Sequence, residues 1–143
     1  MIDYADDLRS TVTRVSAHLH GLPESAVARR PTPGKWSTKE ILGHLIDSAA
    51  NNHARFVRAL FVDDLICSGY AQEEWVAAQR YQESAWPALA DLWRDYNLHE
   101  VAWQSAPADA PATLDYFMRD YVGHLHHHLR QIDALVGGVY AGR

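Results

Sequence analysis

The chain has little of several features that mark other protein classes. It contains a single cysteine, Cys67, so an internal disulfide framework is excluded. Its longest apolar stretches are far too short to cross a bilayer. Lys and Arg number 13 against 18 Asp and Glu, and no basic stripe interrupts the net charge of −5. We therefore expect neither a membrane protein nor a nucleic-acid-binding protein.

The first residues also lack the pattern of an exported protein. They are acidic, MIDYADD, and have neither the basic n-region nor the apolar h-region of a secretory signal. With the single cysteine, this favours a cytoplasmic or similarly reducing compartment. Apolar residues make up 48% and charged residues 22% of the 143 positions, as in an ordinary globular protein. That length suits one core, so we expect a single domain over residues 1–143.

Hydrophobic residues recur at spacings of three and four in four long segments, the pattern of helices with one buried face. The segments are residues 5–22, 37–62, 84–96 and 113–136. The second has the clearest start, because Ser37 is a good N-cap and Glu40 completes a capping box. Trp36 and Ile41 flank this cap as a hydrophobic staple. Between the second and third segments the pattern weakens, and residues 72–80 fit a short helix.

These elements predict an all-α fold. We expect an antiparallel four-helix bundle, with a short extra helix or loop excursion between the second and third long helices. Proline and glycine between the segments indicate the connecting loops.

Histidine is the most informative residue type. His124 and His128 lie four residues apart on the last predicted helix, so they share one face. His44 lies on the second predicted helix, at the polar edge of its apolar stripe. If these helices pack together, three neutral imidazoles meet around an open position, as in a catalytic transition-metal site. His126 and His127 point away from this face, which predicts surface positions.

Zinc proteases place a glutamate directly after the first histidine of their helix motif. Leu125 follows His124 here, which excludes that class, and no acidic residue lies between the two histidines. A base, or a carboxylate that orients a ligand, must therefore come from elsewhere, with Asp47 and Asp120 as candidates. The residues expected to surround the ligands or line a pocket are Ser48, Asp47, Asp120, Tyr121 and Gln131.

The stretches that carry the three histidines resemble the DinB-like superfamily of metal-binding four-helix bundles, which includes the YfiT-like metal-dependent hydrolases. They are GKWSTKEILGHLID at residues 34–47 and YVGHLHHHLRQI at residues 121–132. The family pattern is a Trp-Ser helix start, a histidine about two turns later and a final His-x-x-x-His-x-x-Gln-Ile run. The sequence matches it at each point, and Tyr70 and Trp75 are similar, less specifically, to aromatic residues of the family's connecting segment.

The resemblance implies that His44, His124 and His128 bind one divalent transition metal, zinc or nickel, with water in the remaining positions. It also implies a small-molecule substrate. Several relatives act with low-molecular-weight thiols, and many pair as homodimers.

Two functions of different class stay open from the sequence. The first is a metal-dependent enzyme, either a hydrolase or a thiol transferase of small molecules, because a metal of this kind deprotonates a bound water or thiol. The second is a non-catalytic metal-binding, small-ligand-binding or sensor protein that forms a dimer. An open coordination position in an accessible pocket favours the enzyme, and a closed site favours the binding protein.

Overall fold

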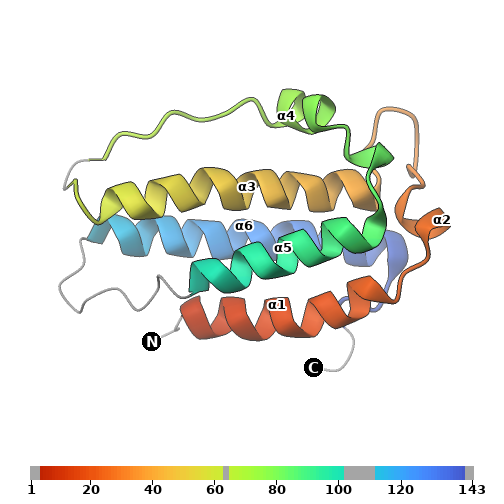
Figure 1. The fold of residues 1–143 in the computed structure, drawn as a ribbon, viewed down its shortest axis with the longest axis horizontal. Helices are drawn as coiled ribbons and strands as arrows, with labels where there is room; N and C mark the ends of the chain where they lie inside the picture. Colours follow the sequence, from red (N-terminus) through yellow and green to blue (C-terminus); the bar gives the residue numbers. More distant parts are fainter. Residues whose placement is uncertain (1–3, 63–64, 102–111, 141–143) are drawn as a thin grey trace.

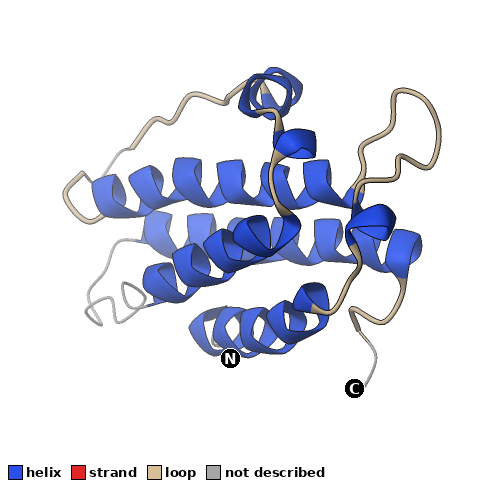
Figure 2. Cartoon of the chain, turned by 45° about the vertical axis from the view of Figure 1, so that its right-hand side comes forward, coloured by secondary structure: helices blue, strands red, loops and turns tan. Residues whose placement is uncertain are grey.

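The computed structural model describes residues 4–62, 65–101 and 112–140. Within those ranges the chain forms helices and loops without a strand (Figure 2). The elements, in chain order, are α1 (Tyr4–His20), α2 (Glu24–Val27), α3 (Thr38–Ala59), α4 (Gln72–Gln79), the 3₁₀ turn η1 (Tyr81–Glu83), α5 (Trp86–Val101) and α6 (Ala112–Val136). No helix in this part of the chain is long and apolar enough to span a membrane.

The four long helices form two antiparallel pairs. The most extensive contacts join α3 with α6 and α1 with α5, and the members of each pair run in opposite directions (Figure 1). The predicted all-α, antiparallel four-helix bundle is confirmed, as is the excursion between the second and third long helices. α3 and α5 run in the same direction, because the chain returns along the bundle between them (Figure 1).

We call this returning stretch the crossover segment; its described parts are residues 60–62 and 65–85. It lies along the outside of α3 and contains α4 and η1 (Figure 1). The crossover segment packs closely against α3 at a glycine, Gly43. A Cβ atom on Gly43 would lie 2.0 Å from the Tyr81 ring. Glycine at this position therefore lets η1 approach the helix that carries His44.

The start of α3 has the predicted capping box. The Glu40 amide donates to the Ser37 hydroxyl over 3.2 Å, and the Ser37 amide donates to Oε2 of Glu40 over 2.9 Å. The Arg30 guanidinium donates to both Glu40 oxygens, which anchors the preceding loop to the cap. Because the cap fixes where α3 begins, it also fixes which side chains face the core two turns later.

The core lies between the four long helices and is made of aliphatic and aromatic side chains. Its largest fully buried members are Trp86, Trp93, Tyr121, Leu8, Leu19, Leu42, Leu45, Leu125, Leu129, Ile132 and His44. A histidine in this set is unusual, because a buried imidazole must be neutral or paired.

Candidate metal centre

Packing of α3 against α6 brings the three predicted histidines together. Nε2 of His124 lies 3.2 Å from Nε2 of His44 and 3.1 Å from Nε2 of His128. One ligand atom from each of the three histidines lies within 4.8 Å of the others. His124 and His128 reach the site from successive turns of α6, and His44 reaches it from the facing side of α3. The predicted convergence is thus found in the structure.

The surroundings keep all three imidazoles neutral at pH 7. Burial, followed by the neighbouring His128 and His124, lowers the pKa of His44 from 6.5 to about 3. Burial also lowers the pKa of His124 to about 4, although the Asp120 carboxylate opposes this shift. For His128, burial lowers the pKa, and the contact with Gln131 opposes it. Neutral imidazoles keep a lone pair, so this donor set fits a divalent transition metal.

The outer nitrogens of the three rings have different partners. Nδ1 of His128 lies 2.6 Å from Oε1 of Gln131, and Nδ1 of His124 lies 3.4 Å from the Ser48 hydroxyl. Nδ1 of His44 is buried without a hydrogen-bond partner among the described residues. The Trp36 ring lies beside His44, with ring centroids 5.2 Å apart. Trp36, which directly precedes the N-cap Ser37, therefore contacts a candidate ligand.

The five residues expected around the ligands fall into three groups. Ser48 and Gln131 contact the histidines directly, whereas Asp120 and Tyr121 line a cavity with His124. Asp47 faces the crossover segment, where its Oδ1 accepts hydrogen bonds from Tyr81 over 2.6 Å and from Gln79 over 3.2 Å.

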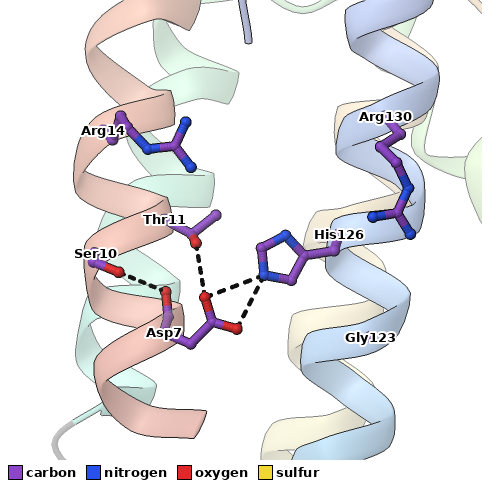
Figure 3. A pocket seen from close by; sticks show the side chains of 7 residues that line it. All are labelled: Asp7, Ser10, Thr11, Arg14, Gly123, His126 and Arg130. Carbon is purple, nitrogen blue, oxygen red and sulfur yellow. Dashed lines mark hydrogen bonds and ion pairs between the residues drawn. The ribbon is translucent and has the colours of Figure 1, made fainter. Parts of the chain in front are cut away.

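The two remaining histidines of the α6 run lie away from the candidate centre. His127 is exposed, as predicted. The prediction of a surface position is wrong for His126, whose side chain is 19% exposed and packs toward α1 (Figure 3). Its Nε2 lies 3.1 Å from the Asp7 carboxylate, and its Nδ1 lies 2.9 Å from the Tyr140 hydroxyl. This ring thus helps to join α6 to α1.

His124, one of the three candidate ligands, borders two cavities. A cavity of about 160 Å³ is bounded by α3, α6 and the crossover segment, and His124 forms part of its wall. The other lining residues are Ser48, Asn52, Arg55, Gly69, Tyr70, Gln72, Asp120 and Tyr121. A wider groove of about 470 Å³ also borders His124, and its lining includes Asp120 and His127.

The residues predicted to line a pocket did not include Asn52 and Arg55, which line the smaller cavity. Both follow Ser48 on α3 at spacings of four and seven, so they share its helical face. That spacing is the signal that could have identified them. Gln72 gives no comparable signal, because it reaches the cavity through the packing of the crossover segment.

Two comparisons with known proteins agree with this geometry. A solved structure of YfiT from Bacillus subtilis, described as a probable metal-dependent hydrolase with an unusual four-helix bundle topology, is similar with a TM-score of 0.79. The match covers 92% of this chain and 83% of that one at 19% identity, a level that shows the fold. Among curated proteins, none matches. The family model of the DinB superfamily matches residues 7–132, and the chain therefore belongs to that superfamily.

Proposed function

We propose that the protein is a metal-dependent enzyme that acts on small molecules. In this proposal, His44, His124 and His128 hold one divalent metal, zinc or nickel. The observation that carries the proposal is the meeting of three neutral imidazole nitrogens beside a cavity. A site closed on every side would favour a non-catalytic binding or sensor protein instead. His124 borders two open spaces, so the enzyme is the better supported function.

When bound, such a metal supplies a Lewis acid that makes a thiol or water a stronger nucleophile near neutral pH. The chain's own residues bind the metal and orient its ligands. His44, buried without solvent contact, fixes one ligand position, and Gln131 holds the ring of His128. Ser48 contacts the His124 ring and lines the cavity in which the substrate is expected.

We favour transfer of a low-molecular-weight thiol over hydrolysis. Attack by water is usually assisted by a general base, and within the described ranges the ligand cluster is made of three histidines without a carboxylate. Asp120 lines the same cavity but is solvent-exposed, so it is the one carboxylate to test as a base. A thiol has an intrinsically lower pKa than water and needs less assistance. The resemblance to thiol-using relatives supports the same choice.

We further propose that the protein works as a homodimer in the cytoplasm. The family resemblance supports the dimer, and the single, half-buried Cys67 suits a reducing compartment. The net charge of −5 gives no reason to propose a nucleic acid as partner.

The decisive experiment is a metal analysis followed by a substrate screen. Protein purified without a histidine tag is expected to carry about one divalent metal per chain. The loaded protein is then incubated with cysteine or glutathione and monochlorobimane, and separately with p-nitrophenyl acetate, against a His128→Ala control. Conjugate formation above the control supports thiol transfer, and ester cleavage above it supports hydrolysis. Rates equal to the control for every pair would favour the non-catalytic alternative.

A further inference from the structure

Tyr70 brings an unusual hydroxyl group to the cavity beside His124. Its ring lies in the crossover segment and lines the cavity together with Ser48 and His124. The hydroxyl is buried and has no hydrogen-bond partner among the described residues. Burial, reinforced by the Asp47 carboxylate, raises the pKa of Tyr70, and the neighbouring Ser48 hydroxyl and Arg55 guanidinium oppose part of this shift. The group therefore remains a neutral hydrogen-bond donor at physiological pH.

The position of Tyr70 is fixed from both sides. Two residues earlier in the chain, the Ser68 carbonyl accepts a hydrogen bond of 3.2 Å from the Arg55 guanidinium, which ties the crossover segment to α3. After it, the Trp75 ring lies edge-on to the Tyr70 ring at a centroid distance of 5.2 Å. Val76, only 3% exposed, anchors α4 on the bundle. The phenol is thus held against the cavity by packing, and its hydroxyl makes no hydrogen bond of normal geometry to a described residue.

A buried hydroxyl without a partner lowers the stability of a folded protein, and a phenylalanine of nearly the same shape avoids that cost. Its presence beside a candidate metal ligand therefore needs a reason other than stability. A hydrogen-bond donor aimed at the place where a substrate binds supplies one, because preorganised donors stabilise charge that develops on a substrate oxygen. Tyr70 lines the same cavity as His124.

We propose that Tyr70 is a catalytic residue that donates its hydroxyl hydrogen to an oxygen atom of the substrate. This inference rests on the proposed function, and it narrows the substrate class to small electrophiles with a carbonyl or a similar acceptor oxygen. Arg55, on the same wall, adds a positive charge that suits an oxygen bearing negative charge.

The test uses Tyr70→Phe, with Tyr4→Phe as the matched control. Tyr4 is a partly buried tyrosine that packs against the core on α1, and α1 contributes no residue to this cavity. Each variant is loaded with Co²⁺, and acetate, a small oxygen anion, is titrated while the visible spectrum is recorded. We expect Tyr70→Phe to weaken acetate binding by about 10- to 100-fold, as for the loss of a hydrogen bond to a charged group. Tyr4→Phe is expected to bind acetate like the wild type.

A thermal unfolding measurement separates this role from a structural one. Tyr70→Phe removes an unpaired buried group, so its Tm should be unchanged or raised, by up to about 2–4 °C. A lowered Tm combined with unchanged acetate affinity would overturn the inference and make the hydroxyl structural. Equal acetate affinity at equal Tm would overturn it as well. If the wild type gave no cobalt spectrum that depends on His128, the proposed function would fail, and the inference with it.

Discussion

Gln131 holds the ring of His128 in place, with its Oε1 2.6 Å from Nδ1 of the histidine. A neutral imidazole that donates its Nδ1 hydrogen to this oxygen keeps the lone pair on Nε2. Nε2 is the nitrogen that faces His124 at 3.1 Å. The contact thus selects the tautomer in which His128 can bind a metal.

Gln131→Ala should therefore weaken metal binding while leaving all three histidines present. Loss of a partner that orients a ligand typically costs about 10- to 100-fold in metal affinity. Competition with a chromogenic chelator measures the change. Arg130→Ala is the matched control, because Arg130 is an exposed neighbour on α6 that lies on the side of the helix facing α1 (Figure 3). Equal affinities in the two variants would show that the Gln131 contact has no influence on the ligand.

Four histidine variants on α6 are expected to behave unequally. His124→Ala and His128→Ala each remove a nitrogen of the cluster, so the purified protein should lose its metal. His126→Ala and His127→Ala should keep it, because His126 binds Asp7 and Tyr140 and His127 is exposed. Metal content by mass spectrometry checks the prediction. Equal loss in all four variants would contradict the assignment of the ligands.

Local sequence signals predicted the parts of the site that depend on one helix at a time. The capping box at Ser37 and Glu40 has a recognisable spacing, and the structure confirms it. A helical period placed His124 and His128 on one face, and the same period placed His44 at the edge of α3's stripe. Their meeting required only that α3 pack against α6, which the apolar stripes of the two helices favour.

Contacts of the crossover segment could not be predicted in the same way. Its hydrophobic pattern is weak, and its path depends on distant packing, such as the approach of Tyr81 to Gly43. For that reason, the hydrogen bonds from Tyr81 and Gln79 to the Asp47 carboxylate could not be predicted. Asp47 follows His44 by three residues, so it was expected near the ligands, but it lies on the side of α3 that the crossover segment covers.

The stability of the metal-free protein should fall as the pH drops below about 6.5. In the folded chain the pKa of His44 is lowered to about 3 and that of His124 to about 4, from a normal value of 6.5. Between these values the unfolded chain binds protons that the folded chain does not, so acidification favours unfolding. The contribution of the neutral histidines to stability is fully present above pH 6.5 and is lost progressively as the pH falls toward 3 to 4. Thermal melts of the metal-free protein over this range measure the effect.

His44→Leu provides the comparison for the pH dependence. Leucine cannot be protonated, so this variant should show a shallower loss of Tm between pH 6.5 and 4.5 than the wild type. The lowered pKa of Glu40, held by Arg30, affects stability only at more acidic pH. Parallel curves for the variant and the wild type would mean that His44 takes up its proton equally in the folded and unfolded chain.

Two glycine-to-alanine variants in long helices should have opposite effects on stability. At Gly43 a Cβ atom would meet the Tyr81 ring at 2.0 Å, whereas at Gly123 it would find no atom within 4 Å. Gly43→Ala should force Tyr81 away from Asp47 and destabilise the protein by about 1–3 kcal/mol, as overpacking does. Gly123→Ala should stabilise α6 by about 0.5–1 kcal/mol, because alanine loses less backbone freedom in a helix. Urea denaturation midpoints measure both changes. A Gly43→Ala variant as stable as Gly123→Ala would show that η1 does not dock on α3 at this glycine.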